Sequence, residues 1–245
     1  MARWTGGRVS LEDSVASSRS VTGRELRESF YLDIPRLTLG LVSQRGSSLF
    51  LGPLEIISFG QAKTTRSSVE LPIEGGLLVG NRGGRLRIEA GKGRLTASVE
   101  GYRPRLPRPL YVLTQLPFHH TVMRLHLLWQ RGRQPAPGVP VPPTRRAAAA
   151  AIDVGLFAVV ALVAGRRRRL AAIAVIAAGY HIACWSISGR TVGGMITGQR
   201  VVSIDGSRVS PGQAIVRVLA LPLAALRLRA VHDEIAGTEV IADQP

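Results

Sequence analysis

Asp153 stands in surroundings that are unusual for a carboxylate, because it is the one charged side chain in the apolar run 147–164. An ionised carboxylate inside a membrane-spanning helix costs roughly 2.5 to 3.5 kcal/mol on insertion scales. A second apolar run, 170–187, has no formal charge at neutral pH and contains His181. A carboxylate and an imidazole at the same depth could hold or relay a proton, so this pair is a candidate ion or proton site.

The sequence between the two runs determines whether these side chains can meet. Residues 166–169 are four consecutive arginines, and a hairpin folded about their centre sets Asp153 beside Ile182 and close to His181. The alternative is that His181 and its neighbour Tyr180 face lipid headgroups or satisfy a backbone carbonyl group. The sequence leaves these alternatives open.

Three more charged residues could contribute to such a site. Arg146 precedes Asp153 by two helical turns and falls on roughly the same helix face. Arg217 lies inside a third apolar stretch, 214–228. Asp233 lies in a polar segment, where we expect a salt link or a helix cap rather than catalysis.

The segment from Arg146 to Asp153 resembles the opening motif of the RDD family of small membrane proteins, named for one arginine and two aspartates. The resemblance covers about residues 145–241. Later residues of the chain also resemble motifs of the family: Trp185, Gly189, Arg190, Thr191, Gly193, Gly198, Arg200, Val201, Val202, Asp205, Gly206 and the closing stretch 232–240. It implies that Arg146, Asp153 and Asp233 are the name-giving residues, with Arg217 as a further basic position. It also implies membrane association, and transport of ligands or ions has been proposed for the family.

The two apolar runs predict a pair of membrane-spanning helices. Each run has 18 residues, near the lower limit for crossing a hydrocarbon core of about 30 Å. Two buried core helices are the alternative. The third stretch carries Arg217, Pro222 and Arg227 and is shorter than the family usually has, so we do not expect it to span independently.

The chain before these runs has a different sequence pattern, in which short apolar segments are separated by Gly and Pro. Alternation is clearest at 85–89, and glycines at 83–84 and 91–93 fall where hairpin turns are expected. Residues 30–133 are therefore predicted to form an antiparallel β-rich soluble domain, a curled sheet or small barrel, in which 110–129 is a closing strand or a packed helix. The expected strands are 30–34, 37–42, 48–51, 54–59, 68–73, 76–79, 85–88 and 94–99.

The remaining segments complete an α+β organisation. Residues 1–29 are polar and predict a loose tail or a peripheral helix, and the five prolines within 134–144 predict a stiff linker. Inside the RDD-like region, 200–204 has strand character and Asp205-Gly206 is a turn signal. Ser210 and Pro211 are typical of the start of a helix.

We expect no catalytic activity, cofactor or metal centre. His119, His120 and His126 invite a metal interpretation, but no Cys, Asp or Glu lies within ligand spacing in that segment. The single cysteine, Cys184, allows neither an internal disulfide nor a cysteine cluster. No nucleophile, base and acid stand together in the sequence.

The formal net charge of +16 comes almost entirely from arginine and indicates a polyanionic neighbour. Genomic base composition could produce the same arginine usage, and a solvated basic face is the plain alternative. Proximity to a membrane favours anionic lipids over nucleic acid, which we do not expect as a partner. The basic residues concerned in the first domain are Arg82, Arg85, Arg87, Arg94, Arg103, Arg105 and Arg108.

These observations predict a multi-pass protein of the cell membrane. The first 20 residues lack the apolar run of a secretory signal, so we expect the β domain in the cytoplasm and the arginine turn outside. The predicted function is transport of ions or small ligands, with a β domain that binds a ligand or lipid and with a homo-oligomer or membrane complex as a possible assembly. The alternative is a membrane-anchored scaffold or binding module that transports nothing.

Overall fold

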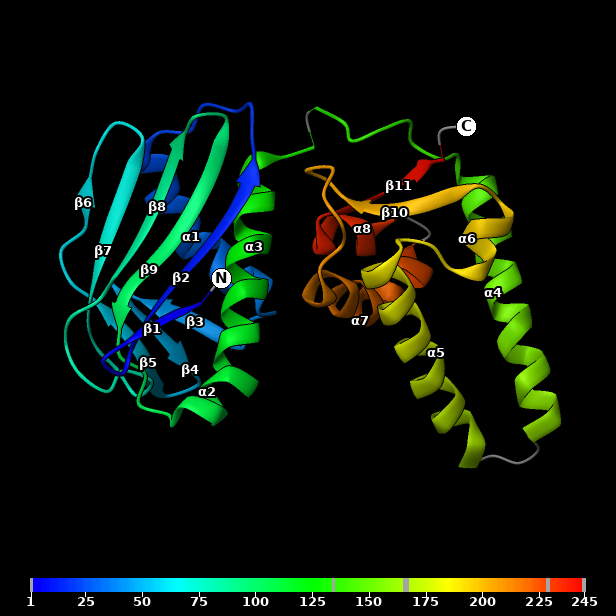
Figure 1. The fold of residues 1–245 in the computed structure, drawn as a ribbon, viewed down its shortest axis with the longest axis horizontal. Helices are drawn as coiled ribbons and strands as arrows, with labels where there is room; N and C mark the ends of the chain where they lie inside the picture. The colour runs from blue at the N-terminus through cyan, green and yellow to red at the C-terminus, as the bar shows by residue number, and fades with distance from the viewer. Residues whose placement is uncertain (1, 134, 165–167, 228–229, 244–245) are drawn as a thin grey trace. The chain divides into compact units, whose positions relative to one another are not determined.

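The chain divides into two compact units, Met1–Gln134 and Pro135–Pro245. The computed structural model describes residues 2–133, 135–164, 168–227 and 230–243. The first unit is a sheet with helices on it, and the second is mainly helical (Figure 1).

Antiparallel pairing connects all the strands of the N-terminal unit in a nine-stranded sheet of order β1-β2-β9-β8-β7-β5-β4-β3, with β6 on β7. Most neighbours in the sheet are also neighbours in sequence. There are two exceptions: β5 pairs with β7, and β2 pairs with β9 and so joins the start of the unit to its last strand. The strands are β1 Arg3–Thr5, β2 Arg8–Ala16, β3 Val42–Arg45, β4 Ser48–Leu51, β5 Leu54–Phe59, β6 Lys63–Thr64, β7 Ser68–Gly75, β8 Arg85–Gly91 and β9 Arg94–Tyr102.

Alternating side chains give this sheet one buried face. Leu86 and Ile88 of β8 are buried, and they lie opposite Val99 and Ala97 of β9, which are buried too. The charged residues between them point to the other face, as the period of two in a strand requires. The predicted antiparallel β domain is therefore confirmed.

Three helices complete the N-terminal unit: α1 Gly23–Leu37, α2 Arg108–Leu113 and α3 Gln115–Arg131. A capping box starts α1, in which Thr22 Oγ1 accepts from the Glu25 amide at 3.3 Å and Glu25 Oε2 accepts from the Thr22 amide at 2.7 Å. Leu26, Phe30 and Ile34 recur every four residues and are buried. Together, α1 and α3 pack against the sheet (Figure 1).

Two sequence predictions for this unit need correction. The predicted polar tail, 1–29, contains β1, β2 and the start of α1, because Val9, Leu11 and Val15 alternate with polar residues and are buried. The strands predicted at 30–34 and at the start of 37–42 lie in α1, because the capping box upstream begins a helix that continues to Leu37. A short apolar run does not by itself distinguish a strand from part of a helix.

The C-terminal unit has, in its described residues, five helices and one antiparallel pair of strands, β10 and β11, which are separated in sequence by α7 and α8. The predicted strand at 200–204 is confirmed as β10, and Ser210 Oγ accepts from the Gln213 amide at 3.2 Å as α7 begins. The elements are α4 Pro143–Ala164, α5 Arg168–Ile187, α6 Val192–Ile196, β10 Gln199–Ser203, α7 Pro211–Arg227, α8 Val231–Ala236 and β11 Thr238–Ala242.

The end of the predicted proline-rich linker is part of this unit. The Val141 amide donates to Val240 O at 3.1 Å, and the Ala242 amide donates to Val139 O at 2.9 Å. The segment therefore pairs with β11, and Val141 is buried. Val139 and Val141 lie between the prolines, and each keeps a backbone N–H group and a carbonyl group that can pair with β11.

The expected transmembrane C-terminal domain is corrected by the structure. Among the described residues, none of the helices combines the length and the apolar character that crossing a membrane requires. The predicted spans were already shorter than the roughly 20 residues that a hydrocarbon core demands. Many of their apolar residues are alanines. In addition, the first turn of α4 contains Thr144, Arg145 and Arg146, and Asp153 lies further along the helix.

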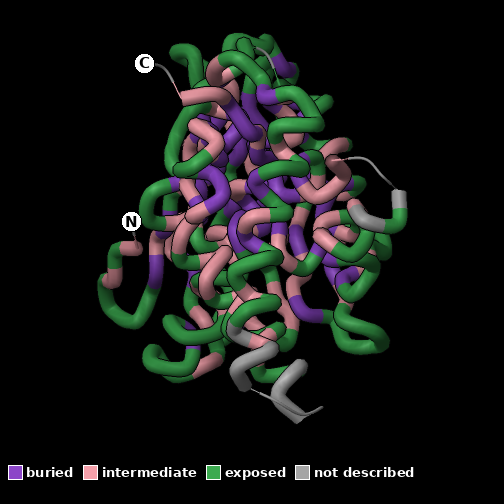
Figure 2. The backbone as a smooth tube through the Cα atoms, turned by 90° about the vertical axis from the view of Figure 1, so that its right-hand side faces the viewer, coloured by how far each residue is buried: buried purple, intermediate pink, exposed green. Residues whose placement is uncertain are grey.

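Exposure along these helices is nevertheless high for apolar sequences. In α5, Trp185 is the one buried residue among those whose burial is described. Figure 2 distinguishes the buried, intermediate and exposed segments. The buried part of the C-terminal unit is formed instead by Val141, Trp185, Val201, Val209, Ala214 and Val240.

Candidate functional site

A buried carboxylate, Asp233, lies between two arginines in the C-terminal unit. Arg146 of α4 donates through Nη2 to one oxygen of Asp233, and Arg217 of α7 donates through Nη1 to the other. The Asp233 side chain is 3% exposed and that of Arg217 is 5% exposed. The three residues belong to α4, α7 and α8, so this charge cluster joins three helices.

Neighbouring side chains complete the environment of Arg217. The Thr238 hydroxyl accepts from Arg217 Nη1 at 2.8 Å and lies 3.0 Å from Asp233 Oδ1, to which it donates. The indole ring of Trp185 lies beneath the guanidinium, whose Cζ is 4.6 Å from the ring centroid. A hydroxyl and an aromatic face therefore supplement the carboxylate in holding a desolvated cation.

The electrostatics of the cluster keep Asp233 ionised. Burial on its own would raise its pKa, but the positive charges around it, chiefly Arg217 and Arg146, outweigh burial and hold the pKa below its usual value. Burial lowers the pKa of His232 to about 4, so that the imidazole is neutral at neutral pH. His232 Nε2 lies 3.3 Å from Arg217 Nη2 and accepts its proton, which assigns the ring proton to Nδ1.

Asp153 forms a separate polar centre. Its Oδ1 accepts from the Gly193 amide at 2.9 Å and from the Tyr180 hydroxyl at 3.2 Å. The same hydroxyl accepts from the Val192 amide at 2.7 Å, so α4, α5 and the start of α6 meet here. Asp153 is 5% exposed, and no ion pair reaches it from the described residues.

A glycine is required beside Asp153. A Cβ on Gly193 would overlap the carbonyl oxygen of Ala149 and touch the carboxylate of Asp153. The close approach of α6 to α4 thus depends on the missing side chain, because only glycine lets the backbone amide reach the carboxylate.

The structure does not join His181 to Asp153. His181 Nδ1 donates to Ala177 O at 2.8 Å within its own helix, and its ring packs on Trp185 with centroids 5.0 Å apart. Tyr180, the preceding residue, supplies the hydrogen bond to Asp153. Folding the two runs as a hairpin predicts which residues lie at the same distance from the arginine turn. It does not predict the direction in which each side chain points around the helix axis, and this direction differs by about 100° between adjacent residues.

Four of the predicted residues therefore fall into two places. Arg146, Arg217 and Asp233 meet in one cluster, while Asp153 lies at a second centre. The sequence places Trp185, His232 and Thr238 in the RDD-like motifs and Tyr180 next to His181, but it assigns none of these four residues a role in the site. The position of Trp185 four residues after His181 indicated that the two rings would meet, but nothing local pairs Trp185 with Arg217.

The three histidines considered for metal binding have other partners or surroundings. His120 Nδ1 lies 2.8 Å from Asp13 Oδ1, and His126 Nδ1 lies 3.0 Å from Asp33 Oδ2. These contacts tie α3 to β2 and to α1. Within the ranges that the structure describes, no group of three ligand-type side chains could hold a metal ion.

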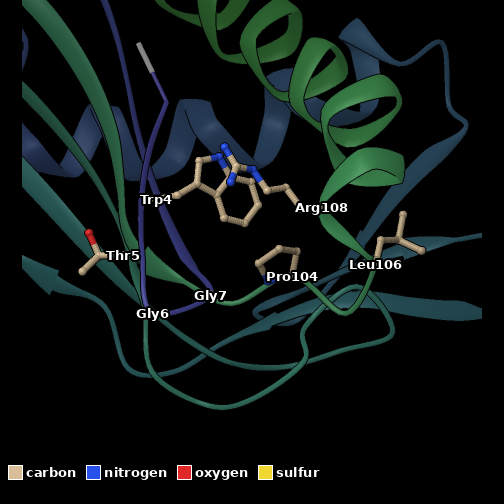
Figure 3. A pocket seen from close by; sticks show the side chains of 7 residues that line it. All are labelled: Trp4, Thr5, Gly6, Gly7, Pro104, Leu106 and Arg108. Atoms are coloured by element: carbon tan, nitrogen blue, oxygen red, sulfur yellow. The ribbon is translucent and has the colours of Figure 1, made fainter.

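An open depression lies beside β1 (Figure 3). Arg108 extends over the ring of Trp4, with Cζ 5.2 Å from the ring centroid, and the two backbone glycines Gly6 and Gly7 form the turn next to them. Because the cation is already stacked on the indole, we assign this feature to the packing of β1 on α2.

Comparison with known proteins bears on the second unit. The RDD family model matches residues 169–237. The C-terminal part of the chain carries an RDD family region. Arg217 and Asp233 lie inside the matched residues, whereas Arg146 and Asp153 precede them. Neither the curated proteins nor the solved structures that were searched gave a match.

The RDD charge cluster predicts a large loss of stability for Asp233→Asn. This variant removes the negative charge while leaving Arg217 buried, and breaking one partner of a buried ion pair typically costs about 3–5 kcal/mol. Urea unfolding followed by Trp185 fluorescence, in a background in which Trp4 and Trp129 are replaced by Phe, would measure it. The matched control is Asp243→Asn, whose partner Arg190 is 39% exposed, and here we expect a loss below about 1 kcal/mol. Equal losses in the two variants would contradict a buried, tightly held cluster.

The lowered pKa of His232 predicts that the RDD unit becomes less stable in mild acid. In the unfolded chain His232 takes up a proton near pH 6.5, but in the folded chain only near pH 4, so the unfolded state binds more protons in between. Stability is therefore full above about pH 6.5 and falls as the pH drops toward 4, by about 3 kcal/mol at most. The lowered pKa of Asp233 adds a loss in the same direction at still lower pH.

The measurement compares urea midpoints at pH 7.5 and pH 4.5 in the parent chain and in His232→Gln. His119 has a pKa of about 4 as well, because it is buried, so part of the acid loss will persist in the variant. If the urea midpoint falls by the same amount between pH 7.5 and pH 4.5 in both proteins, His232 is not the source of the acid loss.

Proposed function

We propose that this protein is membrane-associated, that its RDD unit rests on anionic lipid, and that its β domain is the part that binds a ligand. The observation that carries this proposal is the number of large apolar side chains exposed on the helices of the RDD unit. Monomeric soluble proteins rarely expose large contiguous apolar surface, and such surface usually marks contact with a membrane or a protein.

Large exposed apolar residues occur in the N-terminal unit too, at Leu32 and Leu39 for example, but those that carry the proposal lie on four consecutive helices of the RDD unit. Their exposed fractions run from 40% to 81%, although polar residues are plentiful elsewhere in the chain. They are Val154, Leu156 and Val159 on α4, Val175, Ile176 and Ile187 on α5, Met195 and Ile196 on α6, and Ile215, Leu219, Leu223 and Leu226 on α7.

The charge of the chain selects the kind of lipid. A net charge of +16 is attracted to the negative surface potential of membranes that contain anionic lipid, at about 1 kcal/mol for each Lys or Arg near the surface. A bilayer of this kind provides an apolar layer and an anionic layer together. Nucleic acid would provide only the second, so lipid accounts for both features.

The RDD charge cluster supports an architectural role in this proposal. Both oxygens of Asp233 are taken by arginines, and Arg217 also has Thr238 and Trp185 as partners. A buried carboxylate that binds two arginines from different helices fixes α4, α7 and α8 relative to one another. The exposed apolar side chains of α4 and α7 are thereby presented on a fixed framework.

Asp153 supports a second candidate function, the exchange of a proton or a cation. It is a buried carboxylate with a hydroxyl and an amide as donors and with no ion pair in the described part of the unit. A buried carboxylate that has no counter-ion among the described residues is suited to pair with a cation that the unit takes up. This is the residue on which an ion-transport role would depend.

Flotation with lipid vesicles tests the membrane proposal. We expect the protein to float with vesicles containing phosphatidylglycerol and to float poorly with vesicles of phosphatidylcholine alone. Replacing Val159, Val175 and Leu219 together by Gln should reduce flotation about tenfold or more, because it removes apolar surface from three helices.

The matched control changes Leu32, Leu39 and Leu41 to Gln, three apolar residues of the N-terminal unit with exposed fractions of 57%, 79% and 69%. Its flotation should remain that of the parent protein. Failure of the parent protein to bind anionic vesicles, or an equal loss in both triple variants, would contradict the proposal.

Asp153→Asn tests the exchange function. In vesicles reconstituted with the full chain, proton-coupled cation flux should fall at least tenfold in this variant if the carboxylate carries the ion, because Asn retains the shape and loses the charge. Asp205→Asn, in the exposed turn after β10, is the control and should leave flux intact. Equal flux in the parent and in Asp153→Asn removes Asp153 from any transport mechanism.

A further inference from the structure

A cavity of about 90 Å³ lies inside the β domain, between the sheet and helices α1 and α3. Its walls are mostly apolar, with Phe30 from α1, Ile73 from β7, Leu86 from β8 and Val122 from α3. The lining includes no Asp, Glu, Lys or Arg. The interior of the domain therefore holds space that its own side chains leave unfilled.

The size of this cavity matters for what it could hold. A single water needs roughly 10–15 Å³, so the space is several times larger than one water requires. An apolar cavity of this kind stays dry and takes up small apolar molecules. A short alkyl chain is thin and flexible enough to enter where a ring system is not.

One polar side chain on the wall has no partner. Both the nitrogen and the oxygen of the Gln115 amide are buried and lack a hydrogen bond from the residues that the structure describes. Another polar group of the lining, the Tyr102 hydroxyl, is already used, since it donates to Leu78 O at 2.7 Å. An unpaired buried amide is unfavourable, and a ligand that both accepts and donates would satisfy it.

The opening of the cavity is marked by Phe118. This residue lines the cavity and is also 54% exposed, so the cavity reaches the surface at the first turn of α3. Gln115 lies one turn earlier on the same helix and His119 is the next residue along. Burial keeps His119 neutral at neutral pH, with a pKa of about 4, so the opening carries no charge to attract an ionic head group.

We propose that this cavity binds a single-chain amphiphile with a neutral hydroxyl or protonated carboxyl head, whose alkyl chain fills the cavity while its head exchanges hydrogen bonds with Gln115. The site rests on the proposed role of the β domain as the ligand-binding part, and it does not depend on membrane association. Such a head can donate to the Gln115 oxygen and accept from its nitrogen at the same time.

Isothermal titration calorimetry of the full chain with 1-octanol, without vesicles, tests this site. We expect saturable binding of one molecule per chain. Gln115→Leu should weaken that binding roughly three- to tenfold, because it removes the hydrogen bonds and keeps the apolar wall. Val122→Phe should abolish binding, because the added ring occupies the cavity.

Matched controls separate this site from general affinity for apolar surface. Gln44→Leu makes the same replacement at an exposed residue whose amide donates to Gly46 O, and it should bind octanol as the parent does. Octyltrimethylammonium has the same chain with a head that neither donates nor accepts, and it should give no saturable binding. If Val122→Phe does not fold by circular dichroism, the comparison of Gln115→Leu with Gln44→Leu decides alone.

Three results would overturn the proposal: no saturable octanol binding by the parent, equal affinity in the parent and in Gln115→Leu, or equal binding of the ammonium compound. Each can occur while vesicle flotation is normal, because flotation reports on the RDD unit and calorimetry without vesicles reports on the cavity. Octanol binding with failed flotation would likewise contradict only the membrane proposal.

Discussion

The RDD unit depends on the solvation of one buried charge, the guanidinium of Arg217. A cation this deeply buried must be paired, because removing it from water without a partner costs several kcal/mol. Asp233 supplies the pairing charge, and it comes from α8, whereas Arg217 comes from α7. The ion pair thereby holds α8 against α7, and Arg146 on the other carboxylate oxygen places α4 in the same arrangement.

The N-terminal unit is held by a different constraint, the pairing of β2 with β9. That pairing covers one side of β9 and joins residues about 85 positions apart, and α3 then packs on β2 and β9. Polar contacts fix the helices on this frame: a buried one joins His126 to Asp33 between α3 and α1, and a partly buried one joins His120 to Asp13 between α3 and β2. In the C-terminal unit, ion pairs of Asp233 hold three helices together. In the N-terminal unit, the pairing of β2 with β9 holds the sheet and its helices together.

Periodic patterns in the sequence determined most of what could be predicted. The alternation at 85–89, the turn at Asp205-Gly206 and the cap at Ser210 depend on neighbours within four residues, and all appear in the structure. Residues 1–29 were misjudged because β2 alternates apolar with strongly polar residues, so its mean polarity conceals a buried face. The predicted spans were misjudged because hydropathy counts alanines toward a span that is too short, and Asp153 interrupts one of them.

The charge cluster shows where sequence reasoning reaches its limit and what geometry adds. The resemblance selected Arg146, Arg217 and Asp233, but only the structure shows that the two arginines share one carboxylate, which leaves one positive charge in excess. The excess is not borne by Arg217, which is 5% exposed and has Thr238 and the face of Trp185 as further partners. It falls to Arg146, whose side chain is 26% exposed. Because hydration of a cation is strongly favourable, the surplus charge lies at the partner that water can still reach, and His232 avoids adding to it by remaining neutral.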